Sequence, residues 1–240
     1  YLSFLDKNGL KGARIGVVRE SMGYDAEPGS EDFNKVSAVF DQAIAELKTA
    51  GAAIVDPVVI PRLKELLAKR AGSFADEEAA FVNYLSRSAR PPYKSREEAK
   101  NSPDFSKVTK RSRERWTRTT ATTAHYEYLV AREELTTHFL KVMADNKLDA
   151  IVHKAVEHQP TFIKDGINPP FVDQKGAPHI NTFLVFVPSI VVPAGFTSDN
   201  LPAGITFLGR PYDDGNMIKL AYAYEQITHH RRPPGSTTPL

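Results

Sequence analysis

Residues 186–224 read FVPSIVVPAGFTSDNLPAGITFLGRPYDDGNMIKLAYAY, in which a polar loop separates two apolar runs. The first run, Val187–Val192, is rich in β-branched residues and is closed by a Pro-Ala-Gly triplet. That composition is typical of a strand buried on both faces. The second run, residues 203–208, predicts another strand, and the loop 197–200 joins the two.

A turn and a helix follow these strands. Residues 209–212 turn the chain, and Asp213 or Asp214 is placed to cap the helix at its N-terminus. The apolar residues of this helix recur at helical spacing and are Met217, Ile218, Leu220, Ala221, Tyr224 and Ile227. The stretch therefore predicts strand, loop, strand and covering helix, an arrangement that any α/β protein could contain.

The N-terminal part adds a strand–helix–strand unit. Ala13–Val18 and Ala52–Ile60 predict the strands, and Ser30 is placed to cap the helix between them. The apolar face of that helix comprises Phe33, Val36, Val39, Phe40, Ala43, Ile44 and Leu47. Such a unit favours a parallel strand pair with a right-handed crossover.

The middle of the chain is predicted to be helical. We interpret residues 61–146 as a helical insertion within one domain that spans 1–240, and the last helix of the insertion runs from Thr119 to Asn146. Leu148–Val152 then predicts a short buried strand. Residues 157–178 are rich in proline, glycine and polar side chains, which predicts a long loop on the surface or along a pocket.

Four segments of the sequence resemble the amidase-signature family: GLKGARIGV at residues 9–17, VPSIVVPAGF at 187–196, LPAGITFLGRPYDD at 201–214 and LAYAYEQITHHRRPP at 220–234. Agreement over so long a stretch is far more specific than a short motif. The resemblance runs from end to end and covers half of a family member. It implies an α/β fold with a mixed sheet flanked by helices, the C-terminal half of the amidase-signature fold.

The resemblance also implies a function for the complete protein, the hydrolysis of carboxylic amides through an acyl-serine intermediate, without a metal or an organic cofactor. The family's catalytic lysine and two serines lie in a glycine- and serine-rich tract, and no such tract occurs in this sequence. We therefore expect no catalytic residues here and no activity from these residues alone. Two alternatives stay open: a fragment of the A-type subunit of an aminoacyl-tRNA amidotransferase, and a non-catalytic packing or binding domain.

Ser189 and Lys154 lie in or beside apolar runs, but neither is expected to be a catalytic group. Ser189 lies in the first apolar run of the quoted stretch, and the sequence has no GxSxG elbow, so we interpret Ser189 as a hydrogen-bonded core serine. Lys154 follows the strand Leu148–Val152, at a position where α/β sites collect. Lysine side chains are almost always solvated, so we expect an exposed structural lysine.

His153, His158 and a basic segment are the other groups that could bind a ligand. The two histidines do not match a zinc motif, and we interpret them as polar loop residues. The basic segment surrounds Trp116 and comprises Lys107, Lys110, Arg111, Arg113, Arg115 and Arg118. It could follow a phosphate backbone, but a solvated helix face is the simpler interpretation.

The resemblance implies a site just before the first apolar run, where the family carries residues that wall the acyl pocket. Asn181, Thr182 and Phe183 occupy this position. Thr182 offers a hydroxyl and Phe183 an apolar ring, and both could equally belong to the core, because pockets and cores use the same side chains.

Composition limits the partners. The chain has 240 residues and a formal charge of +2, which argues against a general nucleic-acid binder. It has no cysteine, which excludes disulfides and is compatible with a reducing compartment, so we expect a cytoplasmic protein. No apolar run is long enough to cross a membrane, so we expect no membrane partner. The expected partners are a small amide substrate and the missing N-terminal half. A half-sheet would expose apolar surface, so a homo-oligomer is also expected.

Overall fold

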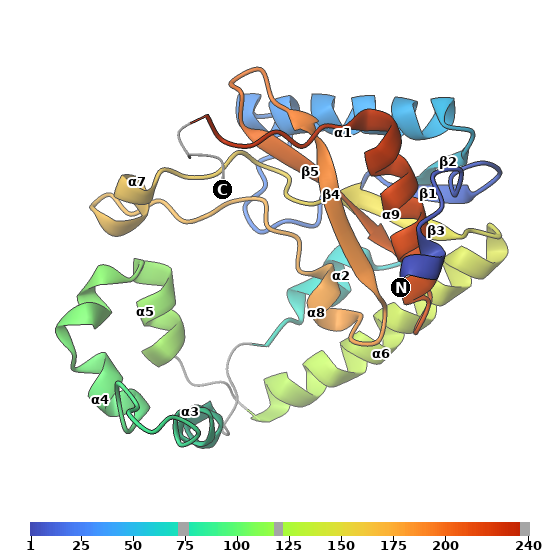
Figure 1. Cartoon of the computed structure of the whole chain (residues 1–240). Coiled ribbons are helices and arrows are strands. Elements are labelled where there is room, and N and C mark those ends of the chain that lie inside the picture. Colours follow the sequence, from blue (N-terminus) through green and yellow to red (C-terminus); the bar gives the residue numbers. More distant parts are fainter. Residues whose placement is uncertain (72–76, 118–121, 236–240) are drawn as a thin grey trace. The chain divides into compact units, whose positions relative to one another are not determined.

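The computed structural model describes residues 1–71, 77–117 and 122–235 (Figure 1). Its elements are η1 (Leu2–Phe4), β1 (Arg14–Val18), α1 (Glu31–Thr49), β2 (Ala53–Val58), α2 (Leu63–Ala68), α3 (Glu77–Leu85), α4 (Arg96–Lys100), η2 (Pro103–Lys107), α5 (Lys110–Thr117), α6 (Thr122–Asp145), β3 (Ala150–Lys154), α7 (Ile163–Ile167), α8 (Ile180–Phe183), β4 (Ser189–Phe196), β5 (Pro202–Leu208) and α9 (Asp214–Thr228). They form two compact units. Unit 1 comprises Tyr1–Leu67, Arg132–Gln159 and Lys175–Leu240, and unit 2 comprises Ala68–Ala131 and Pro160–Gln174.

Unit 1 contains a five-stranded sheet in the order β2-β1-β3-β5-β4. β1 pairs in parallel with β2 and β3, whereas β5 is antiparallel to β3 and β4. The prediction of a mixed sheet flanked by helices is confirmed. So is the parallel pair, because β1 and β2 are the strands on either side of α1.

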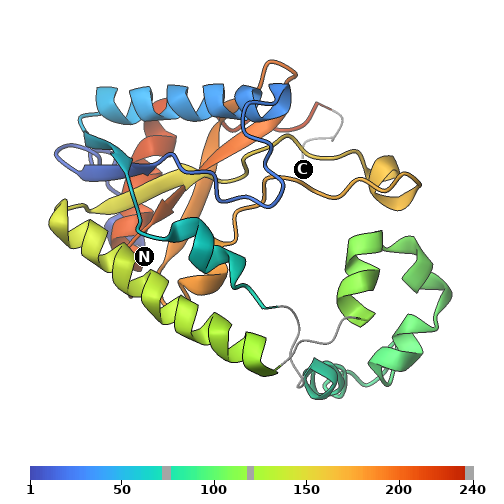
Figure 2. The same ribbon diagram turned by 180° about the vertical axis from the view of Figure 1, so that it is seen from behind.

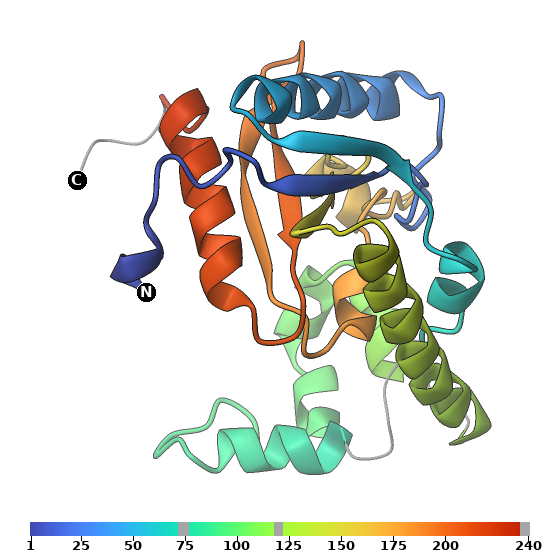
Figure 3. The same ribbon diagram turned by 90° about the vertical axis from the view of Figure 1, so that its right-hand side faces the viewer.

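One face of the sheet is covered by α1 and α9 (Figures 1 and 3). The Ser30 hydroxyl caps α1 by accepting a hydrogen bond from the Phe33 amide at 3.2 Å. α1 then buries the stripe that its 3.6-residue period predicts. The strands contribute alternate residues to this core, namely Ile15, Val17, Ala150, Val152, Ile205 and Phe207.

The other face is covered by the Arg132–Asp145 part of α6 together with α2 and α8 (Figures 2 and 3). The buried side chains that do not belong to the core under α1 and α9 include Leu63, Leu66, Leu135, Phe139, Met143, Leu148, Ile151, Phe183 and Leu208. A sheet covered on both faces explains why all five residues of β3, in the middle strand, are buried.

β4 is an edge strand, and the prediction that it is buried on both faces is wrong. Val191 and Pro193 are exposed, while Val192 and Ala194 are buried. A strand with a single neighbour, covered on one face, leaves alternate side chains in solvent. The pairing with β5 shifts register between Pro193 and Gly195, so β4 contains a bulge there.

α9 begins where the sequence predicts it, although its cap differs. Asp213 is the N-cap residue, but its side chain makes no hydrogen bond to the helix backbone. Its carboxylate accepts a hydrogen bond from the Asn216 side-chain amide at 3.1 Å instead. Residues 217–224 provide the buried face, and Ile227 is exposed.

Unit 2 is helical, and Trp116 lies among aromatic neighbours. Its ring is 5.6 Å from Phe81 and 5.8 Å from Phe105, and the Arg96 guanidinium lies 5.0 Å from its centre. The Ser95 hydroxyl caps α4 by accepting a hydrogen bond from the Glu98 amide at 3.1 Å.

The helices α2 to α6 all lie between β2 and β3 in the sequence. That residues 61–146 are an insertion within one amidase-signature domain stays a prediction. In the described part of the chain, no helix combines the length and the apolar character needed to cross a membrane.

Candidate functional site

Polar side chains gather where the parallel strands β1 and β3 end. The carboxyl ends of parallel strands are where α/β proteins bind ligands. Lys154 is the last residue of β3, and its ammonium donates to the Ser37 hydroxyl of α1 at 2.7 Å. The same nitrogen lies 3.8 Å from the centre of the Phe33 ring.

The expectation of an exposed lysine at position 154 is wrong. Only 8% of Lys154 is exposed. The side chain alternates in phase with Ala150 and Val152, whose side chains pack in the core under α1 and α9. Burial of the ammonium lowers the pKa of Lys154, and the nearby charges of Glu157 and Asp41 oppose this effect.

We expect the substitution Lys154→Met to change how stability depends on pH. Because the folded-state pKa of Lys154 is lowered, the unfolded chain binds the proton more tightly. Stability therefore rises with pH between the folded-state pKa and the unfolded value of about 10.4. Lys154→Met should flatten this rise in urea unfolding measured from pH 7 to pH 10. The control Lys141→Met, at an exposed lysine, should keep the wild-type slope. An unchanged slope in Lys154→Met would contradict the burial argument.

Arg19, directly after β1, ties three elements together. Its guanidinium donates to the Asp56 carboxylate of β2 at 2.9 and 2.7 Å and also to Asp41 of α1. These two carboxylates raise the pKa of Arg19, the Asp56 hydrogen bonds most of all. Arg19 therefore stays charged and links the end of β1 to β2 through Asp56 and to α1 through Asp41.

Glu157 joins the loop after β3 to the loop after β1. Its buried carboxylate accepts hydrogen bonds from the Ser21 hydroxyl at 2.6 Å and from the amides of Met22 and Gly23 at 2.8 and 2.9 Å. The Glu157 amide in turn donates to the Gly176 carbonyl at 2.8 Å. Both ends of the long loop 157–178 are therefore fixed to unit 1.

His153 and His158 are both buried, and the interpretation as a loop residue is wrong for His153 but holds for His158, which lies in the loop after β3. His153 belongs to the buried strand β3, and the Gly176 backbone packs against His158. In each, Nδ1 lies near a main-chain carbonyl, at 2.7 and 2.8 Å. Burial lowers the pKa of His153. Among the described residues, no three acidic or histidine side chains gather as metal ligands.

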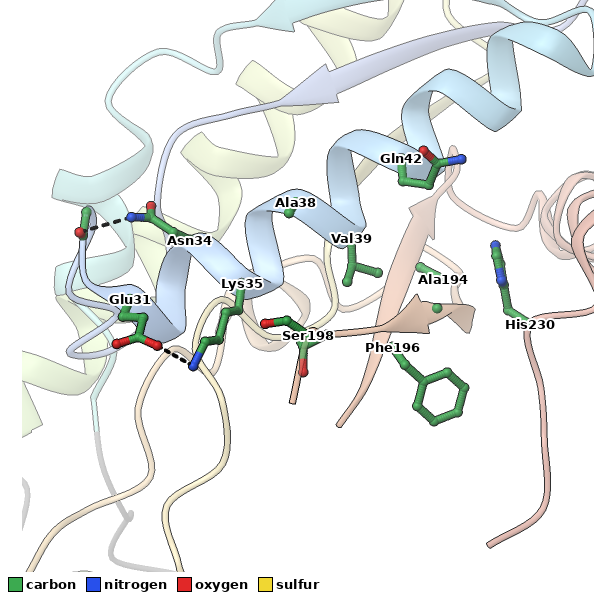
Figure 4. Close-up of a pocket in the computed structure, with 13 residues that line it drawn as sticks. Glu31, Asn34, Lys35, Ala38, Val39, Gln42, Ala194, Phe196, Ser198 and His230 are labelled. Carbon is green, nitrogen blue, oxygen red and sulfur yellow. Dashed lines mark hydrogen bonds and ion pairs between the residues drawn. The ribbon is translucent and has the colours of Figure 1, made fainter. Parts of the chain in front are cut away.

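A pocket of about 850 Å³ lies between α1 and the end of β4 (Figure 4). It is lined by Gly29, Glu31, Asn34, Lys35, Ala38, Val39, Gln42, Ala194, Gly195, Phe196, Thr197, Ser198 and His230. Polar side chains at its two ends are held in place. Lys35 contacts Asp199 and Glu31 at 2.6 Å each, and His230 Nε2 lies 2.9 Å from the Glu46 carboxylate.

Gly195 shapes the wall of this pocket. Its φ of +135° falls in the region that favours glycine, and an added Cβ would lie 3.3 Å from Val39. The wall therefore combines the bulge of β4 with Val39 of α1, a residue far from Gly195 in the sequence. Sequence reasoning missed the pocket, and the Pro-Ala-Gly triplet that ends the apolar run was the one local signal of an irregular strand end.

The predicted wall residues Asn181, Thr182 and Phe183 form most of α8 and do not line this pocket. Asn181 donates to the Ser189 hydroxyl at 3.1 Å, and Thr182 donates to the His179 carbonyl at 2.7 Å. Phe183 is buried. Ser189 is exposed, so its interpretation as a core serine is wrong, because it starts an edge strand.

The Lys154–Ser37 pair has the wrong polarity for serine catalysis. A general base must accept the serine proton. Here the Ser37 hydroxyl donates to the Phe33 carbonyl at 2.9 Å and accepts from Lys154. The geometry supports a structural hydrogen bond rather than a nucleophile with its base.

Two of the known proteins compared resemble nearly the whole chain, and a third resembles a short part of it. A probable amidase of Arabidopsis thaliana is 26% identical over 251 residues, which cover 98% of this chain and 42% of that protein. The peptide amidase of Stenotrophomonas maltophilia superimposes with a TM-score of 0.65 at 26% identity, over 98% of this chain and 47% of the other. The A-type subunit of the glutamyl-tRNA(Gln) amidotransferase of Thermodesulfovibrio yellowstonii is 43% identical over 56 residues, 22% of this chain and 12% of that protein.

The chain thus spans less than half the length of these relatives. The family model described as Amidase matches residues 1–218. With the mixed sheet of unit 1, this match shows that the chain belongs to the amidase signature family.

Proposed function

We propose that these 240 residues are the C-terminal part of an amidase that hydrolyses carboxylic amides through an acyl-serine intermediate, and that they are inactive alone. The main support is the family match over residues 1–218 combined with the coverage of 42% and 47% of two relatives. The sequence also lacks the glycine- and serine-rich tract that the resemblance associates with the catalytic serines and lysine.

The geometry of unit 1 agrees with this proposal. The Lys154–Ser37 hydrogen bond runs from lysine to serine, opposite to the direction that a nucleophilic serine requires. Ser189 is exposed and accepts from Asn181. The Ser37 hydroxyl directs its proton to the Phe33 carbonyl rather than to Lys154. A catalytic serine with its base would be supplied by other residues of the complete protein.

The substrate in the complete protein is proposed to be a small carboxylic amide, and Asn181, Thr182 and Phe183 are proposed to wall the acyl pocket. Asn181 and Thr182 are exposed on α8, and both are held by hydrogen bonds to neighbouring residues. The buried Phe183 ring would anchor the helix and fix these two polar side chains.

We expect the purified 240-residue chain to release no ammonia from peptide amides or other carboxamides above the buffer rate. It should also form no adduct with a serine-directed fluorophosphonate, because no serine described above is activated. Ammonia release and intact mass measure the two outcomes. A full-length amidase of the family, assayed in parallel, shows that substrate and probe are active.

Turnover that disappears after fluorophosphonate labelling would overturn the proposal of an inactive part. Labelling of one serine without turnover would also contradict it, since it would place an activated nucleophile among these residues. Mapping the labelled peptide would then identify that serine.

A fragment of an amidotransferase A-type subunit is the second candidate. The short match to the amidotransferase is 43% identical, well above the 26% of the longer match to the probable amidase. A protein of this kind would need partner subunits and charged tRNA. Copurification from the source cells with other subunits and glutaminyl-tRNA formation would favour it, whereas ammonia release by the complete protein alone would favour the amidase.

A non-catalytic packing or binding domain is the remaining alternative. It shares the expected lack of turnover with the amidase fragment. Adding the complementary residues of the parent protein separates the two, since only the amidase fragment would restore hydrolysis. Light scattering on the same samples tests the expected homo-oligomer, which a monomer at high concentration would exclude.

A further inference from the structure

The loop 160–174 in unit 2 presents an apolar tip. We define the α7 tip as the side chains of Phe162, Ile163, Ile167 and Phe171, all of which are exposed. Phe162 is 73% exposed and Ile163 is 83% exposed, values far above those usual for large apolar residues. Exposed apolar side chains that cluster in this way mark an interaction surface.

The backbone of the loop holds this tip in a defined shape. The Thr161 hydroxyl donates to the Asp173 carbonyl at 2.9 Å and closes the base of the loop. The Val172 amide donates to the Asp165 carbonyl at 2.8 Å, and the Asn168 side chain donates to the Lys164 carbonyl at 2.8 Å. The exposed side chains therefore sit on a hydrogen-bonded turn.

Cationic groups lie beside the α7 tip. The Lys164 ammonium is 5.5 Å from the centre of the Phe162 ring, and the Lys110 ammonium is 5.8 Å from the centre of the Phe171 ring. Lys110 begins α5, whose sequence KRSRERWT contains four cationic residues and one acidic residue. Apolar side chains flanked by cations are the signature of a segment that binds at the surface of an anionic membrane.

The side chains favour a lipid surface over a nucleic acid. Stacking on bases requires aromatic rings or guanidinium groups, whereas Ile163 is the most exposed residue of the tip and is aliphatic. Some cations of the basic segment are also occupied within unit 2. Arg113 donates to the carbonyls of Ser106 and Val108, whereas Lys110, 3.2 Å from Glu114, keeps half of its side chain exposed and stays accessible to headgroups.

We propose that the α7 tip docks unit 2 onto the surface of a bilayer that contains anionic lipids, with Phe162 and Ile163 inserted and Lys110 and Lys164 at the headgroups. This association is peripheral and involves no spanning helix. It departs from the sequence-based expectation of no membrane partner, which rested on the absence of a long apolar run.

The test is sedimentation of the 240-residue chain with vesicles of phosphatidylcholine alone and with about one third phosphatidylserine. We expect binding to the anionic vesicles, weaker binding to the neutral ones, and a decrease as salt is raised. The double variant Phe162→Ser, Ile163→Ser should lower the partition coefficient at least about tenfold, since two large apolar side chains no longer leave water. The double variant Lys110→Glu, Lys164→Glu should remove the preference for anionic vesicles.

The matched control is the double variant Phe186→Ser, Tyr212→Ser in unit 1. These two stacked aromatic residues are 66% and 80% exposed, so they match the α7 tip in exposure but have no part in it. Their replacement should leave vesicle binding unchanged. Circular dichroism and the fluorescence of Trp116, the single tryptophan, confirm that each variant is folded.

Three results would overturn the proposal. One is a wild-type chain that does not sediment with anionic vesicles. Another is an equal loss of binding in the control and in the Phe162→Ser, Ile163→Ser variant. The third is binding to single-stranded RNA, measured by gel shift, that survives the loss of Phe162 and Ile163 while vesicles are not bound.

Discussion

Replacing Glu157 with alanine is expected to lower the free energy of unfolding of unit 1 by about 4 kcal/mol. The carboxylate is buried and accepts three hydrogen bonds, two of them from the Met22 and Gly23 amides. Hydrogen bonds to a charged group contribute about 1.5–3 kcal/mol each, and the donors left behind in Glu157→Ala would lie unpaired in a buried site. Urea unfolding followed by circular dichroism gives the change in free energy.

Hydrogen exchange separates this effect from a general loss of stability. In Glu157→Ala, the Met22 and Gly23 amides should exchange much faster than the amides of α1. Glu157→Gln keeps one acceptor oxygen and should recover less than half of the loss. The control Glu133→Ala removes an exposed carboxylate and should change stability by less than about 0.5 kcal/mol. Wild-type exchange at Met22 and Gly23 in Glu157→Ala would contradict the assignment.

Replacing Gly176 with alanine is expected to destabilise unit 1 by about 3 kcal/mol. The φ of Gly176 is +69°, and an added Cβ would lie 2.5 Å from the His158 amide nitrogen and 3.0 Å from the Glu157 carbonyl carbon. These neighbours are backbone atoms, which cannot rotate away. The Gly176 amide also donates to the Tyr24 carbonyl at 2.6 Å, so a shift of residue 176 would strain that bond as well.

Gly12 offers a matched control for the backbone conformation. Its φ is +74°, close to that of Gly176, but an added Cβ would meet no atom within 4 Å. Gly12→Ala should therefore cost only about 1 kcal/mol, the conformational part of the effect. Thermal unfolding of both variants measures the difference. Equal losses would show that close packing at Gly176 is unimportant.

Local sequence patterns predicted the strands of unit 1 from their apolar, β-branched runs and the helices α1 and α9 from their 3.6-residue period, whereas the short helix α8 was not predicted. The cap at Ser30 and the apolar stripe of α1 are both present. Burial in β4 was overestimated, because an apolar run does not reveal how many neighbours its strand has. Strand order depends on pairing between distant segments.

The burial of Lys154 illustrates how a small boundary error hides a site residue. The sequence predicted a strand over residues 148–152, and β3 spans Ala150–Lys154. A shift of two residues keeps the same alternation, so the longer strand would have placed Lys154 in line with Val152 under α1. The general preference of lysine for solvent outweighed this pattern in the prediction.

The pocket could not be predicted, because its walls come from α1, the bulge of β4 and His230. The wall residues Asn181, Thr182 and Phe183 stay a prediction that rests on resemblance. The residues that fix the loop 157–178 were also missed, since a glutamate between two histidines gives no local sign that its partners are Ser21, Met22 and Gly23.

The outer strands of the sheet each contain a proline, Pro57 in β2 and Pro193 in β4. The carbonyl of Gly204, opposite Pro193, accepts from the amide of Ala155, the residue directly after β3 on the other side of β5, so the nitrogen of Pro193 points away from β5. A second chain that paired with the free edge of β4 would lack one main-chain hydrogen-bond donor, at Pro193 near the middle of the strand. This gap limits endless strand-by-strand growth, the step that begins fibril formation.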